Sequence, residues 1–111
     1  MQIAQLKKGK PYLFTDVTRW GGKGDNLLRL NQVFNVPPGF IISSDTFNDW
    51  IKDSRLSSFL LDVLSSKDSE EAYQSIRQRF LATGLQGDLV SRLDKEFRRM
   101  ETPIAIRSSS V

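Results

Sequence analysis

The sequence predicts an α+β (mixed α/β) fold made of short strands with four or so helices. Two short runs rich in β-branched and aromatic residues, Pro11–Phe14 and Phe40–Ser43, predict strands, and Ile104–Ile106 predicts a third. Between them, apolar residues recur at helical spacing over several segments. The chain has 111 residues, of which 39% are hydrophobic and 26% charged, so it is expected to form one globular domain at most.

The first helix is expected from about Asp25 to Val33, directly behind a glycine-rich stretch. The segment 36–39 cannot lie inside a helix, because its two prolines remove backbone donors and favour extended neighbours. It therefore leads into the strand Phe40–Ser43. Ser44 then has the character of an N-cap, followed by a short helix whose apolar residues are Phe47, Trp50 and Ile51.

Three further helices are expected before the last strand. The run from Leu56 to Leu64 is apolar almost all round, which predicts a buried helix. Asp68 resembles the cap of the next helix, which should end near Gly84. Apolar residues between 89 and 100 form the last helix, and Pro103 ends it.

The composition excludes several classes of chemistry. The chain has no cysteine and no histidine, which rules out disulfides, thiolate metal sites, Ser-His or Cys-His catalysis and a phosphohistidine carrier within it. No apolar run approaches the length of a membrane span, and the N-terminus lacks a signal-peptide core, so a cytoplasmic protein without membrane contact is expected. The positive charge is concentrated in the first 24 residues, where Asp16 is the one acidic residue. This suits a site for polyphosphate or a nucleic-acid surface.

The stretch Gly21-Gly22-Lys23-Gly24 indicates a phosphate-holding loop. Glycines let backbone approach a ligand closely, and a helix that opens behind them offers free N–H groups and a partial positive charge. The alternative is ordinary turn punctuation with a solvated lysine. The stretch is not a Walker A loop, because Gly24 and Asp25 follow the lysine in place of Ser or Thr. Any metal must therefore be held from elsewhere.

Three motifs together resemble one family. They are Gly-Gly-Lys-Gly-x-Asn-Leu at 21–27, Val-Pro-Pro-Gly-Phe-Ile-Ile-Ser-x-x-x-Phe at 36–47, and Ala-Ile-Arg-Ser-Ser at 105–109. In order and spacing they resemble the N-terminal nucleotide-binding region of the phosphoenolpyruvate synthase and pyruvate phosphate dikinase family, which includes rifampin phosphotransferases. The resemblance extends from about Trp20 to Ser110.

The resemblance implies the first lobe of an ATP-grasp domain, in which two lobes clamp ATP. In the family, ATP phosphorylates a histidine on a mobile domain, and that histidine passes phosphate to pyruvate, an antibiotic or another acceptor. Carried onto this sequence, Gly21, Gly22, Lys23 and Gly24 would contact ATP from the glycine loop. Arg107 and Ser108 would contact it from the end of the last strand. Two permanent cations suit phosphoryl transfer, which depends mainly on positioning and charge neutralisation.

Two departures from the family qualify this reading. Asp25 stands where the family commonly has a small residue, which brings a negative charge near the proposed phosphates or simply favours the helix start. The sequence also stops before the acidic metal-binding residues, the second lobe, the phosphohistidine domain and the acceptor domain of the family. Residues 1–111 are therefore expected to be the N-terminal part of a dikinase-type ATP-binding domain. No catalytic or metal-ligating residue is expected within the chain, the Mg²⁺ ligands are expected outside it, and the chain alone is expected to be inactive.

Two other functions stay open at this point. One is a non-catalytic interaction module that keeps the fold of the lobe. The other is a small basic nucleic-acid binder, which is disfavoured because the aromatic residues fall on apolar helical stripes and do not alternate with lysines. The expected partners are ATP and the remaining domains of a parent enzyme. Self-association through an uncovered apolar face is a further expectation, and the phosphate acceptor is left open.

Overall fold

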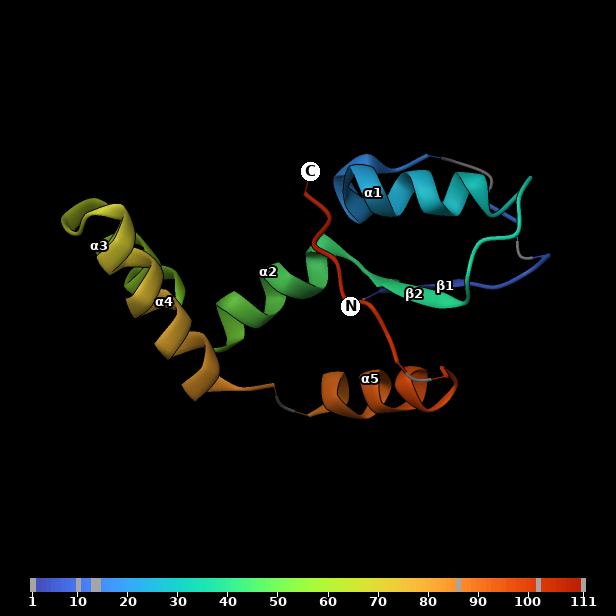
Figure 1. Ribbon diagram of the computed structural model, residues 1–111. Helices are drawn as coiled ribbons and strands as arrows, with labels where there is room; N and C mark the ends of the chain where they lie inside the picture. The colour runs from blue at the N-terminus through green and yellow to red at the C-terminus, as the bar shows by residue number, and fades with distance from the viewer. Residues whose placement is uncertain (1, 10, 13–14, 86, 102, 111) are drawn as a thin grey trace.

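The computed structural model describes residues 2–9, 11–12, 15–85, 87–101 and 103–110. Two strands and five helices follow one another in these residues (Figure 1). Their order is β1 (Ile3–Leu6), α1 (Val17–Leu30), β2 (Gly39–Ile42), α2 (Ser44–Asp53), α3 (Ser57–Ser66), α4 (Ser69–Thr83) and α5 (Asp88–Arg98). The α+β class predicted from the sequence is confirmed.

The sheet consists of β1 and β2, which pair antiparallel with Ile3 opposite Ile42 and Leu6 opposite Gly39. The second predicted strand therefore exists, but its partner was not predicted. In the region of the first predicted strand, Pro11 and Tyr12 form no strand, while residues 13 and 14 lie outside the described residues. The four residues of β1 are too few to show a period-two pattern, and their strand conformation follows from pairing with β2.

The two faces of the sheet pack against different helices, because successive side chains of a strand point to opposite faces. Ile41 lies on the face toward α1, where its Cγ2 atom lies close to Gly24. Phe40 lies on the other face and meets Phe97 of α5 edge to face, with ring centroids 5.2 Å apart. Gln5 lies opposite Phe40 in the register and donates a hydrogen bond of 3.0 Å to Glu96. Figure 1 accordingly shows the sheet between α1 and α5.

The first helix differs from its prediction. It begins at Val17 and ends at Leu30, whereas the sequence predicted about Asp25 to Val33. The Asp16 side chain caps it by accepting a hydrogen bond of 3.1 Å from the Arg19 amide. Gly21 interrupts it with φ 74° and ψ 168°, so one turn of helix precedes the break and a longer segment follows. The glycine stretch is therefore a kink within a helix, and the predicted loop is wrong.

The predicted strand Ile104–Ile106 is also wrong. Residues 104–110 have no regular secondary structure in the described part of the chain, and no strand pairs with them. A strand is stabilised by a hydrogen-bonded neighbour, and this segment finds its partners at α1. Figure 1 shows it running from α5 past the sheet to the beginning of α2.

The remaining helices keep most of their predicted boundaries. Asp68 caps α4 by accepting from the Glu71 amide at 2.9 Å, and Gly84 ends that helix with φ 66°. The cap of α2 is Ser43, one residue earlier than predicted. The predicted burial of the helix at 56–64 is wrong, because Leu61 and Leu64 of α3 are 71% and 65% exposed. Its main packing partner is α4, so only one face of α3 is covered.

The described chain is elongated, with extents of 48 × 25 × 24 Å and a radius of gyration of 16.1 Å. A compact domain of this length would have a radius of gyration of about 13 Å. Helix α2 joins the part around the sheet to the hairpin of α3 and α4 (Figure 1). The joint is aromatic: Trp50 meets Phe80 edge to face at 5.0 Å, and its indole N–H donates to the Gly84 carbonyl at 2.8 Å. No helix in the described residues is long and apolar enough to cross a membrane.

Candidate functional site

The kink at Gly21 is where the C-terminal segment meets α1. A Cβ atom at Gly21 would lie 2.5 Å from the carbonyl oxygen of Ser109, closer than real Cβ contacts allow. The positive φ of Gly21 would also strain any L side chain. Two independent requirements thus favour glycine here. The close approach that the sequence suggested for a ligand is made by the chain's own Ser109.

Hydrogen bonds fasten the segment to the kink. The Ser109 hydroxyl accepts from the Gly24 amide and donates to the Trp20 carbonyl, both at 2.9 Å. The Gly22 amide donates to the Ser110 carbonyl, also at 2.9 Å. The structure therefore brings together two of the sequence motifs, the glycine stretch and the Arg-Ser-Ser segment. Two of the amides expected to be free for phosphate are engaged by these serines.

The two cations proposed for phosphate are on the surface. Lys23 lies in the first turn after the kink and is exposed, and Arg107 and Ser108 in the C-terminal segment are exposed as well. Within the described part of the chain, neither Lys23 nor Arg107 forms an ion pair. Both head groups therefore remain available to an anionic ligand.

Asp25 has a structural environment that the sequence did not reveal. It is 2% exposed, and its carboxylate accepts from the Tyr12 hydroxyl at 2.6 Å and from the Asp16 amide at 2.8 Å. Burial, and next the hydrogen bond to the Asp25 carboxylate, raise the pKa of Tyr12 to about 12. Asp25 therefore braces the segment before α1 against the helix, which explains an acidic residue beside the glycines.

A groove lies beside the kink and was not predicted. It has a volume of about 590 Å³ and is bounded by the first turn of α1, the junction of β2 with α2, and Ser109 and Ser110. Arg19 lines it and lies 3.4 Å from an Asp16 oxygen and 4.0 Å from one of Asp45. Ser44 donates to the Thr18 carbonyl at 2.8 Å, which ties the two helices together. In the sequence, the one indication of this groove was the pair Arg19 and Trp20 directly before the glycines.

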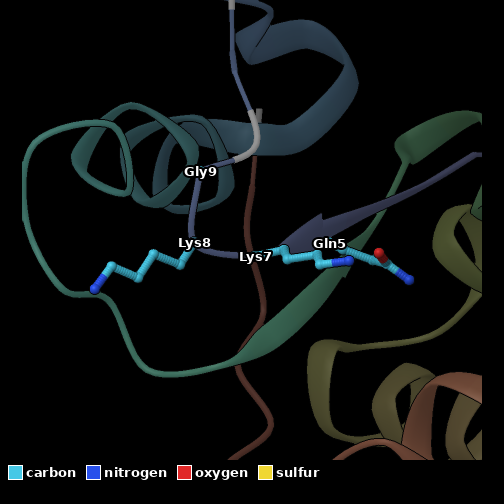
Figure 2. Close-up of a pocket in the computed structure, with 4 residues that line it drawn as sticks. All are labelled: Gln5, Lys7, Lys8 and Gly9. Carbon is cyan, nitrogen blue, oxygen red and sulfur yellow. The ribbon is translucent and has the colours of Figure 1, made fainter.

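A second hollow lies in the basic turn after β1 and has a volume of about 350 Å³. It is lined by Gln5, Lys7, Lys8 and Gly9 (Figure 2). Figure 2 shows the Lys7 and Lys8 side chains extending in opposite directions, with Lys7 running beside Gln5. The two ammonium groups do not converge on one point, so this turn forms no focused anion site.

Carboxylates suited to a metal are not grouped in the described residues. Among them, no cluster of three or more Asp, Glu, His or Cys side chains could hold an ion. The aspartates near the kink are engaged otherwise, since Asp25 is in the Tyr12 network and Asp16 caps α1 and pairs with Arg19. The residues described therefore do not by themselves fit a Mg²⁺ site.

Comparison with known proteins places these motifs in context. The family described as "Pyruvate phosphate dikinase, AMP/ATP-binding domain" matches residues 17–111, which include the kink and the C-terminal segment. The "Probable phosphoenolpyruvate synthase" of Methanothermobacter thermautotrophicus is 28% identical over 109 residues. That match covers 86% of this chain but 16% of the relative, so the chain spans only a small part of the relative's length. No solved structure matches the chain.

Proposed function

The chain belongs to the pyruvate phosphate dikinase AMP/ATP-binding domain family, and from that membership we propose that it supplies one wall of the ATP site of an ATP-dependent phosphotransferase. The observation that carries the proposal is the attachment of Ser109 and Ser110 to the kink of α1. This attachment joins the segment bearing Arg107 to the helix turn bearing Lys23. Two exposed basic side chains then lie near one junction of the fold, which is an arrangement suited to a polyphosphate.

The proposed roles follow from the positions of the residues. Lys23 and Arg107 neutralise charge on the ATP phosphates, and Ser108 offers a hydroxyl next to Arg107. Gly22 and Gly24 donate their amides to the C-terminal segment. We therefore assign Gly21, Gly22 and Gly24 the role of admitting and holding that segment, at the border of the nucleotide. This role replaces the direct cradling of phosphate that the sequence suggested.

The rest of the reaction requires groups that the chain does not contain. From the resemblance to the family, we propose that phosphate passes through a histidine of an ATP-grasp-type parent enzyme. Because the chain itself has no histidine, that residue would lie on another domain. Mg²⁺, if used, would be held by carboxylates outside the described residues. The 111-residue chain alone is therefore expected to bind ATP weakly and to transfer no phosphate. One exposed wall leaves ATP in high dielectric, where two cations gain little over water and salt.

Amide NMR during titration with MgATP tests the proposal. The amides of Gly22, Lys23 and Gly24 should shift, and Lys23→Ala or Arg107→Ala should each weaken binding by roughly two- to fivefold, as expected for exposed ion pairs. Lys67→Ala is the matched control, because it removes an exposed lysine between α3 and α4. Unchanged affinity in both site variants would overturn the assignment. A single-stranded oligonucleotide as competing ligand, with a steep salt dependence, would indicate the nucleic-acid class instead.

In an active enzyme that contains this domain, the same substitutions should act on the chemical step. Loss of a cation that stabilises developing charge should raise the barrier to phosphoryl transfer by about 2–4 kcal/mol. Turnover measured for Lys23→Ala and Arg107→Ala provides the readout. Equal turnover in both variants and the parent would contradict the proposed roles.

A non-catalytic interaction module is the second candidate. The observation in its favour is the apolar surface of α3 and α4, where Leu61, Leu64 and Leu81 are all largely exposed. This candidate expects no ATP-dependent shift at Lys23 and a partner bound through the helical hairpin. The same titration therefore separates it from the first.

A further inference from the structure

We propose that Ser109 is a positioning residue, which acts by fixing Arg107 beside the kink of α1. The inference rests on the function proposed above for Arg107. It assigns a role to the middle serine of Ser108-Ser109-Ser110, whereas the ATP contacts expected from the resemblance included only Ser108. The geometry at Gly21 carries it.

The three serines differ in their surroundings. Ser109 is partly buried, whereas Ser108 and Ser110 are exposed. The Ser109 hydroxyl has both a donor and an acceptor partner at 2.9 Å. Ser110 contributes its backbone carbonyl, which an alanine would keep. Among the three serines, Ser109 is therefore the one whose side chain hydrogen-bonds to α1 in the described residues.

The two partners of Ser109 are paired by helix geometry. In an unbroken α-helix, the Gly24 amide would donate to the carbonyl four residues earlier, which is that of Trp20. The break at Gly21 lies between them, and the Ser109 hydroxyl bridges the two groups. A hydroxyl can do this because it donates one hydrogen bond and accepts others. Side chains that insert into the helical ladder in this way are a recognised cause of sharp kinks.

The consequence for Arg107 follows from chain length. Arg107 is two residues before Ser109, and two residues span at most about 7 Å. With Ser109 fixed, the backbone of Arg107 cannot move far from the kink. Lys23 lies between the two glycines whose amides hold the segment. The Ser109 hydroxyl, together with the Ser110 carbonyl, thus keeps the backbone of Arg107 close to the helix turn that bears Lys23.

The first part of the test examines the bridge itself by amide hydrogen exchange. In Ser109→Ala, the Gly24 amide loses its acceptor and should exchange about tenfold faster, as expected for loss of one hydrogen bond. Ser110→Ala is the control, and it should leave the Gly24 amide unchanged. Equal exchange of Gly24 in the parent and in Ser109→Ala would overturn the inference.

The second part is a double-mutant cycle with MgATP as the probe and the full chain as the protein. Ser109→Ala should weaken binding by no more than Arg107→Ala does, roughly two- to fivefold. Adding Ser109→Ala to Arg107→Ala should cause no further loss, because the residue acts through the arginine. If Arg107→Ala alone has no effect, the proposed function fails. If Arg107→Ala weakens binding but Ser109→Ala does not, or adds its full factor in the double variant, the positioning role fails.

A fold check by circular dichroism accompanies each variant. Should Ser109→Ala prove unstable, Ser109→Cys tests the same point, because a thiol fills a similar volume but is a weak donor and acceptor. The cysteine variant should show the same faster exchange of Gly24 and the same dependence on Arg107. Parent-like exchange and affinity in that variant would overturn the role of the hydroxyl.

Discussion

Two regions of the molecule are held together by different means. The first is the body, made of β1, α1, β2 and residues 107–110. The second is the arm, made of α3 and α4. In the body, side-chain hydrogen bonds with backbone amides, as at Ser109 and Asp25, accompany the packing of the buried apolar residues Trp20 and Leu28. In the arm, contacts are largely apolar, with Leu56 at the start of α3 and Val63 and Ala72 among the buried residues.

The difference shows which region is suited to a defined site. Hydrogen bonds between specific atoms fix geometry, whereas apolar contact is non-directional. The kink of the body places the Ser109 hydroxyl between two named backbone groups. In the arm, Leu61 and Leu64 are left largely exposed, and one face of α3 has no partner among the described residues. The body therefore has the directional contacts that the proposed nucleotide site would need, whereas the arm presents an exposed apolar surface.

The largest change in the free energy of unfolding is expected for a buried leucine of the arm, and it tests whether the arm depends on apolar packing. Leu56 is 1% exposed, so Leu56→Ala should lower the free energy of unfolding by about 2–5 kcal/mol through lost burial and a cavity. Leu61→Ala removes the same group from a site that is 71% exposed, and it should change stability by less than about 0.5 kcal/mol. Urea unfolding followed by circular dichroism measures both. Similar values for the two variants would contradict the packing described for the arm.

The next effect tests whether the body depends on backbone geometry. Gly21→Ala meets both a positive φ and the Ser109 backbone, and should destabilise the protein by about 2–4 kcal/mol. Gly22→Ala is the control, because its added Cβ would meet only the Ser110 carbonyl oxygen, at 3.9 Å. That substitution should be neutral or stabilise the helix by up to about 1 kcal/mol. Urea midpoints provide the comparison, and a tolerant Gly21 would show that the segment does not pack as described.

A smaller effect tests the polar network of the body through pH. The pKa of Tyr12 is raised from 10.0 to about 12, so folding favours its protonated form. The resulting stabilisation is fully present below pH 10 and is lost as the pH rises through 12. The urea midpoint of the parent should therefore fall more steeply over this interval than that of Tyr12→Phe, which lacks the titrating group. Parallel curves for the two proteins would indicate that the Tyr12 hydroxyl is neither buried nor held by Asp25.

The last prediction concerns the exposed leucines Leu61 and Leu64 of the arm. Replacing them should change the free energy of unfolding least but should change self-association measurably. The exposed leucines favour self-association, so light scattering should rise with protein concentration. Leu61→Gln combined with Leu64→Gln should shift the protein toward the monomer with little change in unfolding. Val33→Gln is the control, because Val33 is similarly exposed but follows α1 and lies outside the arm. A monomeric parent protein, or an equal effect of the control, would count against the arm as the associating surface.

The sequence determined the elements whose signals are local. Asp68 and Gly84 marked the two ends of α4, because capping and a left-handed stop depend on single residues. The apolar run at 40–42 gave β2, and the residue types gave the α+β class. The three motifs gave the family, whose model then matched residues 17–111. Each of these conclusions needs only neighbours along the chain or a fixed spacing.

The tertiary structure decided the features that depend on distant neighbours. It made β1 a strand because β2 lies beside it, and it left Ile104–Ile106 without a strand partner among the described residues. It made the glycine stretch a helix kink, because the hydroxyl of Ser109 hydrogen-bonds to Gly24 there. The two residues are 85 positions apart in the sequence, so no local pattern reveals the contact. It also buried Asp25, whose partner Tyr12 precedes the helix. A glycine pattern in the sequence indicates that some group approaches the backbone closely. Whether that group is a ligand or another part of the chain depends on the tertiary structure.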